Sequence, residues 1–172
     1  MFTMLDLLRD WFASVILFVD SALSRLVAYL GGVSWHRMSE VARKVYYDAT
    51  HLAQTYKHSE IQPEHLLLAI LSQRQGVVAQ VIEEIDADIE NLRMHIRQHL
   101  SLLPSDLVHN SPTLSIQARE ATRIALAQAA QRPERWVGTQ HILYGIVCQQ
   151  DSVASRMLQE VGLTAEKIHS LL

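Results

Sequence analysis

The chain has 172 residues, a charged fraction of 19% and a formal net charge of -3, and it contains no block of Lys or Arg. Binding to phosphate backbones requires a basic footprint, so nucleic acid is excluded as an expected partner. A single cysteine, Cys148, excludes an internal disulfide and is expected to be a small buried side chain, which fits a reducing cytoplasm. Few Gly and Pro residues, with many Ala, Leu, Gln and Glu, favour helix over sheet.

Residues 1–30 predict an amphipathic helix with a wide apolar face. On a helical wheel, the polar residues fall in one half and the other half holds none. The apolar half includes the candidate docking or membrane residues Leu8, Trp11, Phe12, Val15, Phe18 and Val19. Asp20 interrupts the apolar run, whereas a spanning helix needs about 20 apolar residues, and the segment lacks the basic start of a secretory signal. Gly31 and Gly32 predict a flexible joint, so residues 1–34 are predicted to be an extension of the domain at 35–172.

A straight helix of 30 residues would be about 45 Å long. A compact domain of this size is about 30–35 Å across, so the apolar face needs a further partner. Docking on a protein, self-association, contact with a membrane surface and folding back as a hairpin all remain open. Three Asp against two Arg on the polar side give no attraction to anionic lipid.

The rest of the chain predicts further helices, joined by short loops. Apolar residues at helical spacing predict the first helix at 39–56, and Pro63 is suited to begin the next. Two more are predicted at 77–85 and 89–100. Residues 101–113 contain two prolines and several turn formers, and they predict a linker. Helices at 153–161 and 165–172 follow, with Gly162 at a helix end, and Asp86 at the equivalent place earlier in the chain.

The sequence repeats itself at an interval of 76 residues. Without a gap, residues 38–96 fall on residues 114–172. The residues that land on an identical residue are Ser39, Ala42, Arg43, Ala49, Ala53, His65, Leu67, Ile70, Gln73, Val77, Glu84 and Glu90. Such self-similarity predicts two duplicated helical units that bury a face against each other. Thr139 stands where the first copy has Pro63, and its hydroxyl is expected to cap the equivalent helix instead.

Two sequence motifs, each present in both copies of the repeat, resemble those of a known family. The chain has "IQPEHLLLAIL" followed by "VVAQVIEEID", and later "VGTQHILYGIV" followed by "VASRMLQEVG", in matching order and spacing. This pattern resembles the Clp N-terminal domain, the substrate- and adaptor-binding front end of the Clp AAA+ unfoldases, over residues 38–172. The resemblance implies an all-α fold of two pseudo-symmetric four-helix repeats, at about 38–100 and 114–172. It also implies binding of protein substrates, adaptors or Clp ATPase and protease subunits.

The chain also departs from the Clp ATPases. No G-x-x-x-x-G-K-[ST] motif occurs, so there is no P-loop to hold ATP. We therefore expect a free-standing form of the domain without the motor, with no enzymatic activity and no cofactor. An accessory subunit that docks on the protease ring, and a scaffold tethered to a membrane by residues 1–30, are the alternatives. The expected location is the cytoplasm, with membrane association left open.

The resemblance also implies candidate site residues. In some Clp ATPases the Thr and Glu of a "G-T-E-H" phrase bind phosphoarginine marks. Here the first copy offers Pro63 and Glu64, and the second offers Thr139 and Gln140, so each copy keeps half of the pair. Arg43 and Arg119 occupy equivalent positions, where they either face solvent or bind a carboxylate of a peptide.

Histidines offer the remaining chemistry. His65 and His141 are equivalent, and each is expected to hydrogen-bond the loop before its helix; a metal or hydrolase site at this pair is the rival hypothesis. His95 and His99 form H-x-x-x-H on one helix face, but no Glu follows the first His as in zincins. They are expected to be exposed polar residues, and no metal site is expected.

Overall fold

The structure is a computed structural model that describes residues 37–73, 77–78, 88–106, 112–131, 136–170 and 172. The chain divides into two units, and all of these residues lie in the second, Trp35–Leu172. The predicted helix at 1–30, with its candidate docking face, lies outside the described residues. Asp86 also lies outside them, and the predicted helix at 77–85 is described only at Val77 and Val78, which are helical.

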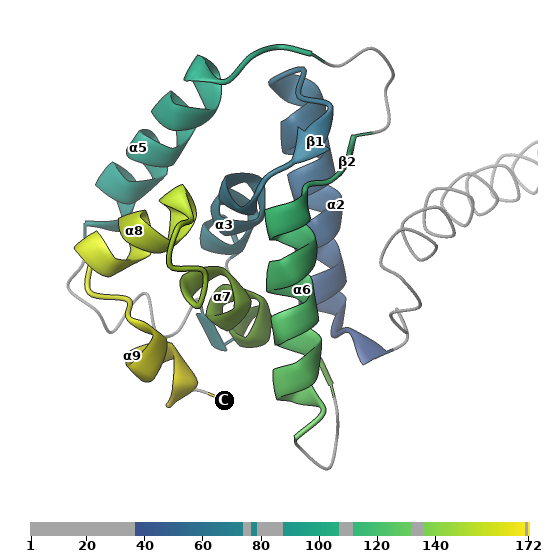
Figure 1. Cartoon of the computed structure of the whole chain (residues 1–172), viewed down its shortest axis with the longest axis vertical. Coiled ribbons are helices and arrows are strands. Elements are labelled where there is room, and N and C mark those ends of the chain that lie inside the picture. The colour runs from purple at the N-terminus through teal and green to yellow at the C-terminus, as the bar shows by residue number, and fades with distance from the viewer. Residues whose placement is uncertain (1–36, 74–76, 79–87, 107–111, 132–135, 171) are drawn as a thin grey trace, which may run out of the picture. The chain divides into compact units, whose positions relative to one another are not determined.

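The described residues form an all-α fold with one minimal sheet (Figure 1). The first repeat supplies α2 (Glu40–Thr55), β1 (Glu60–Ile61), α3 (Pro63–Leu71) and α5 (Ile89–Leu102). The second supplies β2 (Thr113–Leu114), α6 (Ile116–Ala129), α7 (Thr139–Val147), α8 (Val153–Glu160) and α9 (Ala165–His169). The predicted fold class is confirmed.

Side chains near the helix ends explain most of the boundaries. Ser39 and Ser115, which are 76 residues apart, accept hydrogen bonds from the N–H groups of Ala42 and Ala118, both at 3.1 Å. They therefore begin α2 and α6 by the same cap. After α8, Gly162 adopts a φ of 77°, which is easily reached only by glycine.

Two helix ends differ from the sequence prediction by more than one residue. Helix α5 includes Ser101 and Leu102, and β2 begins at Thr113, so the connection between the repeats is shorter than the predicted 101–113. Helix α9 ends at His169 instead of running to the last residue. There the hydroxyl of Ser170 donates to the Lys167 carbonyl at 2.7 Å, and such a local bond competes with continued helix.

The two repeats complete each other's short strands. Strands β1 and β2 are parallel, with Ile61 opposite Leu114, and a second parallel bridge joins Met38 to Val137. The two bridges are equivalent, because adding 76 turns Ile61 into Val137 and Met38 into Leu114. In each case, the strand before one repeat's first helix pairs with the strand before the other repeat's second helix. The repeats are therefore clasped together about a pseudo-two-fold axis.

Helices α3 and α7 form the centre of the described fold (Figure 1). They contact each other, and both also contact α8, while α2 packs on α3 and α6 packs on α7. All nine residues of α3 are buried. This burial explains why the sequence contains the same apolar phrase twice: each phrase is the central helix of its repeat.

A buried hydrogen bond marks the pseudo-two-fold axis. The hydroxyl oxygens of Tyr46 and Thr122 are 2.8 Å apart, and the two residues are separated by 76 positions. Equivalent residues can meet only where the axis passes between them. Thr122 donates its own proton to the Ala118 carbonyl at 2.7 Å, so Tyr46 is the donor in the bond across the axis. Burial raises the pKa of Tyr46, which keeps the phenol protonated.

Replacing Tyr46 with Phe is expected to lower the free energy of unfolding by about 1 kcal/mol, because the hydrogen bond across the axis is lost inside the core. The neighbouring Tyr47 provides a matched control, because its side chain is 71% exposed and Tyr47→Phe removes a hydroxyl from solvent. Urea denaturation followed by circular dichroism would compare the two variants. Equal stability of Tyr46→Phe and the parent would contradict the role given to this bond.

Candidate functional site

Histidine side chains cap the starts of both central helices. His65 Nδ1 accepts a hydrogen bond from the Gln62 N–H at 2.9 Å, and His141 Nδ1 accepts one from the Gly138 N–H at 3.0 Å. The predicted structural role of this pair is confirmed. The prediction that Thr139 caps its helix is wrong, because Thr139 is already the first helical residue and Gly138 is the capping position. Both copies therefore begin this helix by the same histidine chemistry.

His65 is also joined to a second buried histidine. Because His65 Nδ1 accepts from Gln62, a neutral His65 carries its proton on Nε2, which lies 3.0 Å from His58 Nδ1. His58 makes further hydrogen bonds to the backbone of Leu100 and Leu103, at the end of α5. Burial lowers the pKa of His58, and burial followed by the nearby His58 lowers the pKa of His65 to about 3. The pair is therefore neutral at pH 7.

No pattern in the sequence predicts that His58 and His65 meet. His58 has no equivalent in the second copy, where Glu134 stands at the matching position. The repeat therefore does not mark it. A histidine just before a short strand carries no pattern that would predict its burial.

Glu64 forms a hydrogen bond between the first repeat and the second. Its side chain is 4% exposed, and Oε1 accepts a hydrogen bond from the Ala154 N–H at 3.1 Å, across 90 residues. Ala154 lies in the first turn of α8, where an N–H group has no partner within the helix and a negative charge is favourable. This carboxylate thus caps a helix of the other repeat.

The candidate partner-binding residues are not gathered on one exposed surface. Pro63, Glu64 and Thr139 are buried, Arg43 and Gln140 are half-buried, and Arg119 is exposed. Binding of an external guanidinium by Glu64 would have to displace the bond to Ala154. A role of these residues in partner binding remains a prediction.

Removing the Glu64 carboxylate is expected to separate the repeats at α8. Glu64→Ala should lower the free energy of unfolding by about 2 kcal/mol, because a buried N–H group of α8 loses a charged acceptor. Glu64→Gln should cost less, since an amide oxygen can still accept; the second copy has Gln140 at the equivalent position. Guanidinium denaturation would establish this order. An equal decrease in the free energy of unfolding in Glu64→Ala and Glu64→Gln would contradict a capping role for this side chain.

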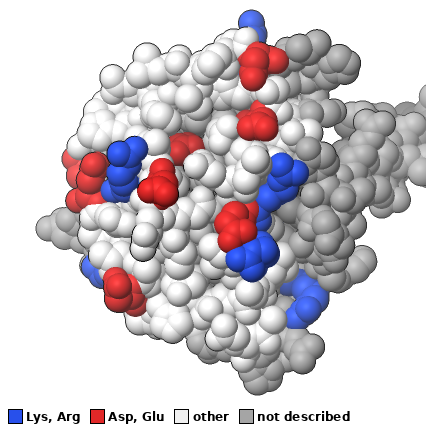
Figure 2. All heavy atoms as spheres, viewed as in Figure 1, with Lys and Arg blue, Asp and Glu red and all other residues white. Residues whose placement is uncertain are grey.

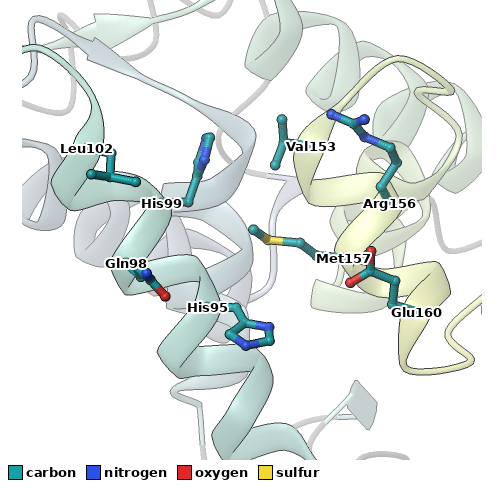
Figure 3. A pocket seen from close by; sticks show the side chains of 8 residues that line it. All are labelled: His95, Gln98, His99, Leu102, Val153, Arg156, Met157 and Glu160. Atoms are coloured by element: carbon teal, nitrogen blue, oxygen red, sulfur yellow. The ribbon is translucent and has the colours of Figure 1, made fainter.

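A solvent-open groove of about 330 Å³ lies between α5 and α8 (Figure 3). Helix α5 contributes His95, Gln98, His99 and Leu102, and α8 contributes Val153, Arg156, Met157 and Glu160. In both helices the lining residues follow the spacing i, i+3, i+4, i+7, so each helix offers one face. Figure 3 shows Leu102 and Val153 at one end of the groove, and His95 and Glu160 at the other. The two helices therefore run antiparallel along it.

The groove gives His95 and His99 a setting that the sequence did not predict. His95 is exposed and His99 is half-buried, and both face α8 of the other repeat. Their shared face was visible in the sequence, but not what lies opposite. Within the described ranges, no three His, Cys, Asp or Glu side chains are grouped closely enough to hold a metal ion.

Other surface features are less concentrated. On the described part of the face in Figure 2, charges of both signs are scattered. Cys148 is half-buried, so the prediction of a small buried side chain is wrong; it follows the last residue of α7. Among the helices of the described residues, none is both long and apolar enough to cross a membrane.

Comparison with known proteins identifies the family. Residues 37–161 match the family described as the Clp repeat (R) N-terminal domain. The chain belongs to this family. Its Clp repeat domain is 28% identical over 138 residues to the ATP-dependent Clp protease ATP-binding subunit ClpC of Staphylococcus aureus, covering 76% of this chain and 16% of that protein. A probable Clp protease ATP-binding subunit of Chlamydia pneumoniae is 27% identical over 134 residues, covering 78% and 16%.

Solved structures confirm the fold of the Clp repeat domain. The N-terminal domain of the ClpV1 ATPase from E. coli EAEC superimposes with a TM-score of 0.70 at 22% identity, covering 88% of this chain and 90% of that one. The Hsp104 N-terminal domain of Candida albicans gives a TM-score of 0.63 at 22% identity, covering 78% and 87%. The chain thus matches domains of Clp-type ATPases and spans 16% of the length of these curated relatives.

Proposed function

We propose that this chain is a non-catalytic protein-binding module of the Clp protease system, which binds substrate proteins, adaptors or Clp subunits. The observation that carries the proposal is the match of residues 37–161 to the Clp repeat (R) N-terminal domain. The groove between α5 and α8, which is open to solvent and is formed by both repeats, is a surface that suits this function. A concave surface with apolar side chains and a polar rim is suited to another polypeptide. One solved chain with the same fold is described as "Peptide from EAEC T6SS Sci1 SciI protein"; its TM-score is 0.70 at 23% identity.

Direct binding measurements would test this function. The full chain would be immobilised, and the Clp ATPase and protease subunits of its host, together with an unfolded model protein, would be passed over it in separate experiments. We expect saturable binding of at least one of them, and binding that does not require ATP. Absence of binding to all of them, with a correctly folded chain, would reject the proposal.

A second candidate is an accessory subunit that docks on the protease ring through residues 1–30. The wide apolar face of that segment, seen in the sequence, favours it. Deleting residues 1–33 should then abolish co-purification with the protease but preserve binding of the unfolded protein. Flotation of the full chain with liposomes, lost on the same deletion, would instead support a membrane-tethered scaffold.

A further inference from the structure

The groove between α5 and α8 is shaped for a third helix. Both helices pack against α3, which lies beneath them. The lining residues of each helix span seven positions, which corresponds to about 10 Å or two helical turns. Two antiparallel helices with such faces leave a straight trough, into which the side chains of another helix can fit at i, i+3, i+4 and i+7.

An extended peptide is a poorer fit. Strand addition requires an exposed sheet edge with unpaired backbone groups. The sheet of the described residues has two strands of two residues each, and neither strand lines the groove. The side chains of α5 and α8 are therefore the surface available there.

The apolar contacts lie along one end and the middle of the groove. Leu102 is 77% exposed, and it lies at the same end of the groove as Val153 (Figure 3). Met157 lies between the two ends, and its unbranched side chain can adapt to a partner. A partner helix could cover these three residues with its own apolar face.

Two charged side chains on α8 indicate which charges a partner helix would carry beside its apolar face. Arg156 and Glu160 are both exposed and lie one turn apart, and no ion pair among the described residues involves either of them. A partner helix lying along α8 would place residues spaced by four opposite this pair. An acidic residue facing Arg156 and a basic residue facing Glu160 would then be complementary.

We propose that this groove binds a partner protein through an amphipathic helix whose apolar face covers Leu102, Val153 and Met157, and whose flank carries an acidic and a basic residue four positions apart. The proposal rests on the proposed function, because it specifies what the protein-binding module takes at this site. It names the chemistry of the bound segment: apolar, helical and of mixed charge.

Three labelled peptides of about 20 residues would serve as probes in fluorescence anisotropy with the full chain. Each would be an alanine-based helix with Leu at i, i+3, i+4 and i+7. Their flanking pairs would be Glu and Lys, two Lys, or two Glu, spaced by four. The parent chain should prefer the Glu and Lys peptide by about fivefold. Because a helix can lie in either direction, the two uniform peptides are needed to separate the charges.

Charge-reversal variants of α8 should then change which of the three peptides binds most tightly. Arg156→Glu leaves two acidic residues on α8 and should prefer the peptide with two Lys. Glu160→Lys leaves two basic residues and should prefer the peptide with two Glu. Leu102→Asp should lower the affinity for every peptide by about tenfold, because the apolar end of the groove is lost. Met94→Asp is the matched control, since Met94 is on the same helix, is 55% exposed and does not line the groove.

Several results would overturn the inference. The first is equal affinity of the parent chain for the three peptides. The second is an unchanged order of peptide affinities in Arg156→Glu and Glu160→Lys. The third is an equal loss of peptide affinity in Met94→Asp and Leu102→Asp. Self-association of the chain that is abolished by Leu102→Asp would assign the groove to a second copy and reject the proposal. If Clp subunits still bind to Leu102→Asp with unchanged affinity, the groove proposal fails while the proposed function stands. If the parent chain binds no protein at all, the proposed function itself fails.

Discussion

Replacing Gly145 with Ala is expected to lower the free energy of unfolding by about 3 kcal/mol. A Cβ atom at Gly145 would lie 2.1 Å from the carbonyl oxygen of Ala121 and 2.9 Å from its carbonyl carbon. These are backbone atoms of α6, so no side chain can rotate away, and α6 and α7 would have to separate. The change has the opposite sign from its usual effect, because Gly→Ala inside a helix normally stabilises it by about 1 kcal/mol.

The repeat makes this prediction informative. The first copy has Ala69 at the position equivalent to Gly145, so a comparison of the two copies predicts that alanine is tolerated. The tertiary structure predicts that it is not, because α7 approaches the α6 backbone too closely. Guanidinium denaturation followed by circular dichroism would measure the loss.

Gly162→Ala provides the control for this substitution. Gly162 has a φ of 77° but no atom within 4 Å of a new Cβ, so only backbone strain of about 1 kcal/mol is expected. If Gly145→Ala were as stable as the parent, the close packing of α7 on α6 would not be a requirement of the fold. Equal destabilisation by the two substitutions would also contradict the steric argument.

Acidification from pH 6.5 to pH 4.5 is expected to lower the free energy of unfolding by about 2 kcal/mol through His65 alone. Its pKa is about 3 in the folded protein and about 6.5 in the unfolded chain. Between these values the unfolded chain binds a proton that the folded protein does not. The stability contributed by His65 is therefore complete only well above pH 6.5, and the loss approaches about 1.4 kcal/mol per pH unit as the pH decreases towards 3.

Burial is the main reason why folded His65 resists protonation, and the hydrogen bonds of the pair fit its neutral form. A proton on His65 Nδ1 would face the Gln62 N–H, which already donates to that nitrogen. A proton on His58 Nδ1 would face the Nε2–H of His65. Because burial also lowers the pKa of His58, the upper part of the pH profile should be steeper than His65 alone predicts.

Urea denaturation at a series of pH values would test the acid prediction. His65→Gln removes a titrating group, so this variant should be less stable at pH 7 but should lose less stability on acidification. His51→Gln is the control, because His51 is an exposed histidine of α2, and its pH profile should follow that of the parent. Parallel profiles of His65→Gln and the parent would show that the buried pair does not govern acid stability.

The groove between α5 and α8 shows what the sequence pattern does not predict about the candidate site. The sequence places His95 and His99 on one helix face, but no pattern in it predicts Arg156 and Met157 as their neighbours. The residues singled out by family resemblance were instead found at helix starts, where Glu64 is buried against α8. Helical spacing predicts which residues share a face, but not which face of another helix lies opposite.

The sequence by itself determined the all-α fold, the duplication, and the starts of most described helices. It could do so because helical periodicity, capping residues and a gap-free repeat are local properties, written in consecutive residues. Only the tertiary structure decided that Glu64 caps α8, that His58 meets His65, that Tyr46 lies on the axis, and that Gly145 cannot take a side chain. These features depend on how the two repeats are rotated and spaced against each other, and that geometry is set by the packing of the whole core.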